Sequence, residues 1–183
     1  MVGWDVLEEE IKKCRRCGLG FTRTNAVIGR GNPNADLLLV GEGPGEQEDK
    51  QGLPFVGAAG KLLDLLLDAL MISKDDYYIA NIVKCRPPGN RVPFENEAEM
   101  CLNFLRNQVY LIKPKIIVCL GNTAANYIIE KGVRITQIRG HWIERKGYLI
   151  MPTFHPAALL RDESKKVLLW EDLKKVRQKL YER

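Results

Sequence analysis

Short apolar runs alternate with segments of helical periodicity along this 183-residue chain, and this alternation constrains the fold more than any other feature. The apolar runs predict strands at 36–40, 77–83 and 115–121, and 141–154 has the pattern of a hairpin whose second arm completes the sheet. Helices are expected at about 4–13, 59–70, 95–112, 122–132 and 164–182. Such alternation predicts an α/β fold, a three-layer α/β/α sandwich with a central four-stranded, mostly parallel sheet.

The composition places the chain among globular proteins and away from membrane and secreted ones. Apolar residues make up 45% of the sequence, enough for one core, so we expect a single domain over residues 1–183. The net charge of +5 is compatible with a polyanionic partner without requiring one. The N-terminal segment has no secretory pattern and the apolar stretches are short or interrupted by charge, which predicts an intracellular, cytoplasmic protein without a membrane partner.

Polar residues stand where the expected strands end. The stretch GEGPGEQED (41–49) follows the first strand, Asn81 lies at the second, Gly121 follows the third and His155 follows the last. Ligands of parallel sheets bind beyond the carboxyl ends of the strands. We therefore expect these four positions to converge on one edge of the sheet.

The glycine-rich turn does not match a phosphate-binding motif. A dinucleotide fingerprint needs a third glycine where Glu46 stands, and a loop through 51–54 is expected to delay the following helix. The Gly-Lys pair in GAAGKLLD (57–64) lacks P-loop glycine spacing and has Leu62 in place of Ser or Thr. Four carboxylates in 41–49 would also repel phosphate. The turn is better suited to a close approach of the backbone to a flat, neutral ligand.

Four of the five cysteines form a candidate metal site. Cys14 and Cys17 make a C-x2-C pair, Cys85 and Cys101 stand singly, and Cys119 lies inside the apolar run IIVCL as a core residue. In an intracellular protein, structural disulfides are unusual. The spacing suits an iron–sulfur cluster at least as well as zinc, and by itself does not choose between them.

Four motifs, together with the cysteine spacing, carry a resemblance to a known family. GEGPGEQED, PFVGAAGKLL, NIVKCRPPGNR and FHPAALLR occur in this order over nearly the whole chain. The sequence strongly resembles the family 4 uracil-DNA glycosylases, base-excision-repair enzymes with a [4Fe-4S] cluster. The resemblance implies a sheet of order 2-1-3-4, counting strands along the chain, and a structural cluster held by Cys14, Cys17, Cys85 and Cys101.

The resemblance also implies roles for the residues at the expected sheet edge. The enzyme would flip deoxyuridine out of DNA and hydrolyse its N-glycosidic bond to leave an abasic site. His155 and the backbone of Gly41, Glu42 and Gly43 would stabilise the uracil anion, Asn81 would read uracil N3–H and O4, and Phe55 would stack on the ring. Glu48 is expected near uracil C5, where it would exclude thymine. Glu42 is expected to position the attacking water, with Gly43 in place of the Asp found in the best-known branch of the wider superfamily.

The resemblance also implies a nucleoid-associated protein, with uracil-containing DNA, single- or double-stranded, as its partner. Its predicted contacts are Arg86, Arg91 and Arg161, with Leu159 or Leu160 as a wedge into the space left by the flipped nucleotide. We expect a monomer, with a sliding clamp or another repair protein as a further candidate partner. Two alternatives remain. One is a relative that traps DNA covalently through a loop histidine, which is disfavoured because no basic, histidine-containing insert precedes the last motif. The other is a non-catalytic iron–sulfur protein.

Overall fold

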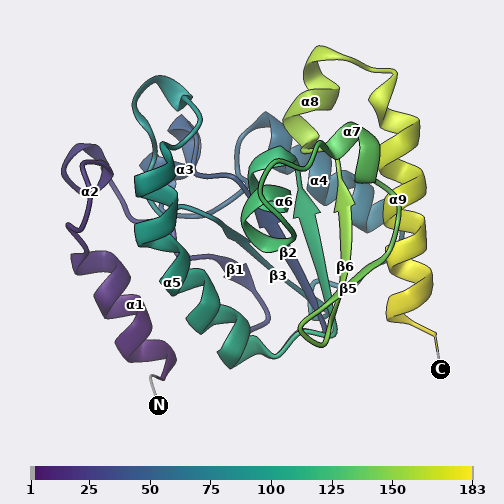
Figure 1. Cartoon of the computed structure of the whole chain (residues 1–183), viewed down its shortest axis with the longest axis horizontal. Coiled ribbons are helices and arrows are strands. Elements are labelled where there is room, and N and C mark those ends of the chain that lie inside the picture. Colours follow the sequence, from purple (N-terminus) through teal and green to yellow (C-terminus); the bar gives the residue numbers. More distant parts are fainter. Residues whose placement is uncertain (1–2, 183) are drawn as a thin grey trace.

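The core of the protein is a parallel sheet, seen in a computed structural model that describes residues 3–182 (Figure 1). Its four parallel strands are β2 (Leu37–Gly41), β3 (Tyr77–Asn81), β4 (Ile116–Leu120) and β6 (Tyr148–Thr153), which lie in the order β3-β2-β4-β6. Every residue of β2, β3 and β4 is buried. Burial on both faces explains why these strands have continuous apolar runs rather than alternating ones.

The sheet has six strands, so the prediction of four was wrong in number. β1 (Arg30–Gly31) pairs antiparallel with β3, and β5 (Ile143–Arg145) pairs antiparallel with β6, which makes the sheet mixed. β1 has two residues and β5 has three, and both are largely solvent-accessible. Strands this short and polar have no apolar pattern of their own, although the hairpin that contains β5 was expected.

Helices cover both faces of the sheet because the chain reverses direction across it. The crossover from β2 to β3 runs one way and contains α4 (Ala58–Ala69), whereas those from β3 to β4 and on to β6 run the other way and contain α5 (Glu95–Ile112) and α6 (Asn122–Ile128). Right-handed crossovers of opposite direction put their helices on opposite faces. Figure 1 accordingly shows α5 and α6 in front of the sheet and α4 behind it.

The remaining helices extend these layers. α1 (Trp4–Lys13) packs on α5, and α9 (Lys165–Leu180) packs on α8 (Pro156–Arg161) and β6. The helix expected over 122–132 ends earlier, at Ile128. The short helices α2 (Leu19–Thr22), α7 (Ile135–Ile138) and α8 and the 3-10 turn η1 (Pro88–Asn90) were not predicted. No helix within residues 3–182 is long and apolar enough to cross a bilayer.

A further unpredicted helix, α3 (Glu46–Gln51), follows the glycine-rich turn directly. The expectation that a loop delays the helix was therefore wrong. Glu48 accepts a hydrogen bond from Gly45 N at 3.1 Å, and the acids Glu46, Glu48 and Asp49 all lie in the first turn of α3. Acidic side chains stabilise a helix N-terminus, where backbone N–H groups are unpaired. Three of the four carboxylates that argued against phosphate binding therefore have a structural role at the start of α3.

Apolar side chains form one large core around the sheet and a smaller one between α1 and α5. Cys119 is fully buried in the large core, as expected, and burial raises the pKa of its thiol. Leu7, Ile11 and Phe104 make the smaller core. Of the expected single domain over 1–183, residues 1, 2 and 183 lie outside the described residues.

Candidate active site

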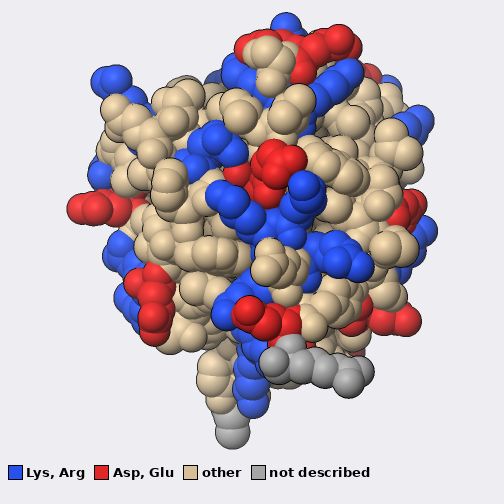
Figure 2. Space-filling model, turned by 90° about the vertical axis from the view of Figure 1, so that its right-hand side faces the viewer, with Lys and Arg blue, Asp and Glu red and all other residues tan. Residues whose placement is uncertain are grey.

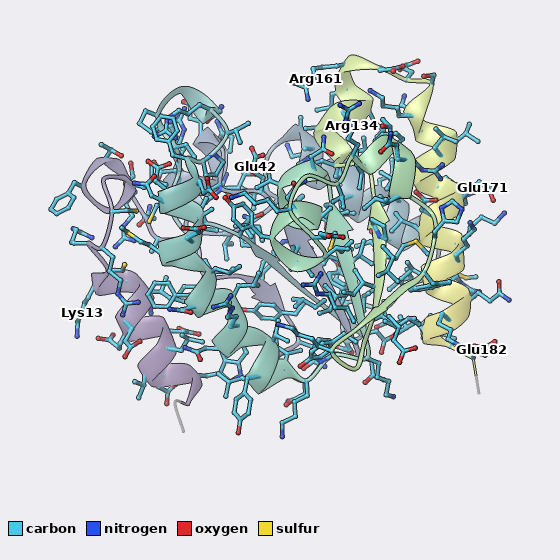
Figure 3. The ribbon with its side chains drawn as sticks, viewed as in Figure 1. Lys13, Glu42, Arg134, Arg161, Glu171 and Glu182 are labelled. Atoms are coloured by element: carbon cyan, nitrogen blue, oxygen red, sulfur yellow. The ribbon has the colours of Figure 1, made fainter. Side chains whose placement is uncertain are left out.

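A cleft of about 790 Å³ lies at the carboxyl ends of the parallel strands. Its lining comes from the last residues of β3 and β4 and from the loops that follow all four parallel strands, so the expected convergence is confirmed. Figure 3 shows Glu42 and Arg161 at this end of the molecule, whereas Lys13 and Glu182 lie far from it. Its lining includes the predicted site residues Glu42, Gly43, Glu48, Phe55, Asn81, His155, Arg91 and Arg161.

Asn81 is the last residue of β3 and presents an unpaired acceptor in this cleft. Its side chain is buried, and Oδ1 is the buried side-chain polar atom that has no hydrogen-bond partner among residues 3–182. Leaving a buried carbonyl oxygen unpaired costs on the order of 1–3 kcal/mol. Such a cost is offset when a ligand supplies the missing N–H donor. Asn81 is therefore placed to accept a hydrogen bond from an N–H group of a ligand.

Gly41 lies beside Asn81 and makes room for its amide. The two residues are register partners on the parallel strands β2 and β3. The carbonyl groups of Gly41 and Glu42 accept hydrogen bonds from Ile82 N at 2.9 Å and Val83 N at 3.1 Å. These bonds fix the turn after β2 against the segment after β3. A Cβ atom on Gly43 would lie 2.6 Å from Val83 Cγ2, so glycine is required there for close packing.

Phe55 supplies an apolar wall at the inner end of the cleft. Its backbone has a φ of 54°, an uncommon left-handed conformation for a bulky residue. Arg30 stabilises this conformation by donating from Nε to Pro54 O at 2.9 Å and from Nη2 to Phe55 O at 3.3 Å. The Phe55 ring stacks on the ring of His155 with a centroid separation of 5.4 Å. A flat aromatic wall of this kind suits a planar ligand.

His155 is the N-cap residue of α8, and its imidazole is neutral. Its Nδ1 accepts a hydrogen bond from Ala157 N at 3.1 Å, so the proton of the neutral ring resides on Nε2. Burial lowers the pKa of His155 to about 4, with the charge of Arg161 adding to the effect and that of Glu48 opposing it. A neutral donor results, fixed in one tautomer and held against Phe55 at the edge of the cleft.

Glu42 projects from the turn after β2 and is held by a residue that the sequence analysis did not single out. Thr123, in the first turn of α6, donates from Oγ1 to Glu42 Oε2 in a short hydrogen bond. This bond fixes one carboxylate oxygen. The signal for it lay in the chain order, because Thr123 comes two residues after Gly121, which was expected at this edge of the sheet.

Glu48 serves as an anchor for the loop that carries Phe55. Besides Gly45 N, its carboxylate accepts hydrogen bonds from Val56 N at 2.9 Å and Gly57 N at 2.8 Å. It therefore ties the start of α3 to the start of α4. It also lines the cleft, where the predicted contact with uracil C5 stays a prediction.

The predicted DNA contacts fall into different environments. Arg161 is exposed and lines the cleft. Arg91 also lines it, and its guanidinium forms a bidentate pair with Glu97, with both N–O distances 2.8 Å. Arg86 donates from Nε to Asn90 Oδ1 at 2.7 Å, which stabilises the turn η1.

Of the two leucines predicted as a wedge, only one reaches the surface. Leu159 is 1% exposed and belongs to the large core, so its assignment to DNA binding is corrected, whereas Leu160 is 55% exposed. The apolar stripe of α8 faces inward at Leu159, and the next residue points to solvent. The wedge prediction therefore stays with Leu160 alone.

The lysines of α9 behave as an ordinary solvated face. Figure 2 shows the side of the molecule to the right in Figure 1, where basic side chains gather among acidic ones. Lys166 pairs with Glu163, Lys174 with Glu171, and Lys179 with Glu182. Surface pairs of this kind contribute little to stability.

The four predicted metal-binding cysteines lie together. Cys14, Cys17, Cys85 and Cys101 line one small hollow where the loop after α1 meets the loop after β3 and the start of α5. Arg23 donates from Nη1 to Cys85 Sγ at 3.0 Å, and Lys84 N donates to Cys101 Sγ at 3.3 Å. Burial raises the pKa of Cys101 to about 11, while the nearby positive charge of Lys84 favours the thiolate.

This cysteine cluster is not arranged around a single ion. No group of three or more His, Cys, Asp or Glu side chains in the described part of the chain is placed to hold one metal ion. A single ion requires sulfur atoms about 2.3 Å from one centre. A cluster with one cysteine on each of four irons spreads its ligands more widely, and it takes an all-thiolate set whose sulfurs can accept hydrogen bonds that tune the cluster. The donor set of this hollow fits such a group.

At this edge of the α/β sheet, the open acceptor of Asn81, the ring of Phe55 and the neutral imidazole of His155 lie in one cleft. This arrangement suits a planar ligand that carries an N–H donor. Comparison with known proteins identifies the family. Residues 28–174 match the family described as "UDG: Uracil DNA glycosylase superfamily", and the chain belongs to it. The match covers the whole of the parallel sheet and the cleft.

Three relatives are similar to this chain over most of their own length. The chain is 46% identical to a type-4 uracil-DNA glycosylase of Thermotoga maritima, with 94% of this chain and 92% of the relative covered. It is 45% identical to that of Sulfurisphaera tokodaii, with coverage of 94% and 82%, and 41% identical to that of Archaeoglobus fulgidus, with coverage of 96% and 92%. These similarities confirm the family inferred from the sequence motifs.

Proposed function

We propose that the protein is a uracil-DNA glycosylase that hydrolyses the N-glycosidic bond of deoxyuridine and leaves an abasic site in DNA. The observation that carries the proposal is the unpaired, buried Oδ1 of Asn81 in a cleft next to an aromatic wall. Uracil presents N3–H beside O4, so the Asn81 amide can accept from the first and donate to the second. Cytosine has an acceptor and a donor at these positions, and would leave both amide groups unpaired.

His155 stabilises the departing base. Cleavage of the glycosidic bond leaves negative charge on the uracil ring, and a neutral Nε2–H donor in the cleft lowers the energy of that state. Its pKa of about 4 means that the imidazole is uncharged at neutral pH, so it acts by hydrogen bonding rather than as a general acid. Main-chain groups of Gly41, Glu42 and Gly43 are proposed to add donors around the same anion.

Glu42 prepares the water that attacks the sugar. The Thr123 hydroxyl holds one carboxylate oxygen and leaves the other to accept a hydrogen bond from water. A carboxylate at this position also favours the positive charge that develops on the deoxyribose as the bond breaks. Both effects act in the transition state, where they increase the rate.

Arg161, Arg86 and Leu160 are proposed to hold the DNA. Arg161 is exposed at the rim of the cleft, where a phosphate of the extruded nucleotide would pass. Leu160 is an exposed apolar side chain next to it and is proposed to fill the space that the flipped nucleotide leaves. Arg91 is expected to contribute less, because Glu97 already neutralises it.

The cysteine cluster is proposed to hold a [4Fe-4S] cluster. Cys14, Cys17, Cys85 and Cys101 would be its ligands, and Arg23 and Lys84 would donate to their sulfurs. When bound, such a group supplies a cross-link among the loop after α1, the loop after β3 and the start of α5. The residues between Cys85 and Cys101 include Arg86 and Arg91, so this cross-link would shape the rim of the cleft rather than take part in bond cleavage.

One assay tests the proposed activity against its alternatives. An oligonucleotide with a single uracil is incubated with the protein, treated with alkali and resolved on a gel, with the Asn81→Ala variant as the matched control. Alkali-dependent cleavage by the unmodified protein, strongly reduced in the variant at the same protein concentration and time, is the expected result. A covalent, slowly migrating protein–DNA band would instead identify a DNA-trapping relative, and an unchanged oligonucleotide would identify a non-catalytic binding protein.

A further inference from the structure

Lys84 is a fully buried lysine whose side chain has no role in the proposed mechanism. Its side chain is among the largest that are completely buried, with 1% exposure. Taking an ammonium group out of water is costly unless the group is paired and hydrogen-bonded. A lysine at such a position therefore calls for partners that a methionine or leucine would not have.

The ammonium group of Lys84 binds the main chain of Asn81. Nζ donates to Asn81 O at 2.8 Å and to Gln108 Oε1 at 2.6 Å. Gln108, on α5, is held in turn by donating from Nε2 to Ile28 O at 2.9 Å. Asn81 O is thus tied through Lys84 to α5 and to the segment before β1.

The backbone of Lys84 is fixed independently of its side chain. Lys84 O accepts a hydrogen bond from Val27 N at 2.8 Å, and Lys84 N donates to Cys101 Sγ at 3.3 Å. The side chain therefore extends from an anchored backbone to a defined carbonyl group. Hydrogen bonds therefore fix both the backbone of Lys84 and the ammonium group at the end of its side chain.

We propose that Lys84 is a positioning residue for base recognition, which holds the peptide of Asn81 so that the Asn81 amide meets the edge of the base. This inference rests on the proposed function of Asn81. The carbonyl group that Lys84 binds and the side chain that reads the base belong to the same residue. Rotation of that peptide would carry the amide out of the plane of the ring, and both of its hydrogen bonds would weaken together.

Packing alone does not account for a lysine here. An apolar side chain of similar volume would fill the same space without the cost of burying a charge, and such replacements are often neutral or stabilising. The polar contacts of Nζ are directed at one main-chain oxygen and one amide. A role in stability and a role in positioning therefore predict different results for Lys84→Met.

A double-mutant cycle of Lys84→Met and Asn81→Ala separates the two roles. The measurements are the single-turnover rate of uracil excision and inhibition by free uracil, on variants shown to be folded by thermal unfolding. Asn81→Ala is expected to lower the rate on the order of 100-fold and Lys84→Met on the order of 10-fold. The double variant is expected to lose about 100-fold, no more than Asn81→Ala alone, because an amide that is absent cannot be mispositioned. Free uracil is expected to inhibit Lys84→Met about 10-fold more weakly than the unmodified protein.

Leu173→Ala provides the matched control for loss of stability. Leu173 is fully buried on α9, which packs mainly on α8 and β6. Leu173→Ala is expected to lower the melting temperature. Any decrease in excision rate that it causes should be the same factor in the unmodified protein and in the Asn81→Ala variant, because the two sites are not coupled. If Lys84→Met does not fold, Lys84→Gln takes its place, since a glutamine leaves no buried charge and is too short by one bond to reach Asn81 O in the same way.

The results distinguish a positioning role of Lys84 from a role in stability alone. Independent effects of Lys84→Met and Asn81→Ala, or unchanged inhibition by free uracil in Lys84→Met, would overturn the positioning role and leave the proposed function intact. Full activity and full sensitivity to uracil in Asn81→Ala would instead overturn the reading of uracil by Asn81, and with it the inference about Lys84. Coupled effects, with weakened uracil inhibition, support the inference.

Discussion

Gly41 and Asn81 face each other at the tips of β2 and β3, and a Cβ atom on Gly41 would lie 2.5 Å from Asn81 Oδ1 and 2.6 Å from Phe55 Cζ. The backbone of one strand thus sets the position of the two side chains proposed to bind the base. The recognition edge and the aromatic wall depend on the absence of a single methyl group.

Gly41→Ala is expected to reduce uracil excision strongly while the protein remains folded. The added methyl group must push aside the Asn81 amide or the Phe55 ring, and a shift of about 1 Å in a reacting group can cost on the order of 100-fold in rate. Single-turnover excision and thermal unfolding measure the two effects. Gly3→Ala is the control, because Gly3 lies at the start of α1, away from the cleft, with open space around it and a φ of −83° that alanine also adopts. Equal activity of Gly41→Ala and the unmodified protein would contradict the proposed site.

The contribution of His155 is expected to be independent of pH between about 5 and 8. Its pKa of about 4 lies below the ordinary value of 6.5, so the ring stays neutral over this range and becomes charged only near pH 4. The same pKa difference affects folding stability. The unfolded chain takes up the proton of His155 near pH 6.5 and the folded chain only near pH 4, so the free energy of unfolding decreases as the pH falls from 6.5 to about 4. Single-turnover rates of the unmodified protein and of His155→Ala, measured across pH 4.5–8, test this. A ratio of the two rates that changes around pH 6.5 would show that a charged imidazole is involved.

Thr123→Val is expected to lower the excision rate on the order of 10-fold without weakening inhibition by free uracil. Valine keeps the shape of threonine but removes the hydroxyl that holds Glu42 Oε2. Glu42→Gln should lose more, because it removes the carboxylate charge itself. The same two measurements, excision and uracil inhibition, separate an effect on the attacking water from one on base binding. Full single-turnover activity of Glu42→Gln would eliminate Glu42 as a catalytic residue.

Glu48→Ala is expected to lower the free energy of unfolding by about 1–3 kcal/mol, because three backbone N–H groups lose their acceptor. Denaturant unfolding measures this loss, and Glu46→Ala is the control, since Glu46 is exposed and pairs with Lys50 on the surface. The predicted contact with uracil C5 has a separate test. Glu48→Ala should gain measurable excision of thymine if the side chain excludes the thymine methyl group, and no gain would limit Glu48 to its role as an anchor.

Replacement of Cys101 by alanine is expected to remove a broad visible absorbance band and to lower the melting temperature. The unmodified protein, purified without oxygen, should be brown and contain about four iron atoms per chain if the cysteine cluster holds a [4Fe-4S] group. Cys119→Ala is the matched control, because Cys119 is buried in the core away from the cysteine cluster and its replacement should leave the colour unchanged. A colourless protein with one zinc per chain would overturn the iron–sulfur proposal.

The parallel strands and the convergence of the site were predictable because each leaves a local signal. Buried strands produce continuous apolar runs, and the polar residues that end them are visible in the same stretches of sequence. Asn81 and His155 could be placed at one edge of the sheet from chain order alone. The strands β1 and β5 left no such signal, since two or three exposed residues form a strand only where a neighbouring strand pairs with them.

The supporting residues were less predictable, because their partners are remote in the sequence. Lys84 stands within a recognised motif, but its partner Gln108 is on α5. Arg30 acts on the backbone of Phe55, and Thr123 on the carboxylate of Glu42. Leu159 was assigned to DNA because two adjacent leucines near a rim look alike in sequence, and only the direction of α8 distinguishes them. Contacts between distant segments determine these roles.

The short antiparallel strands β1 and β5 have a consequence for self-association. They occupy the two outer positions of the sheet, and their length leaves little backbone to which the sheet of a second molecule can be added. Charged side chains at Arg30, Glu144 and Arg145 make these borders still less suited to fibril-like growth. A chain built in this way can become concentrated along a nucleic acid without polymerising through its sheets.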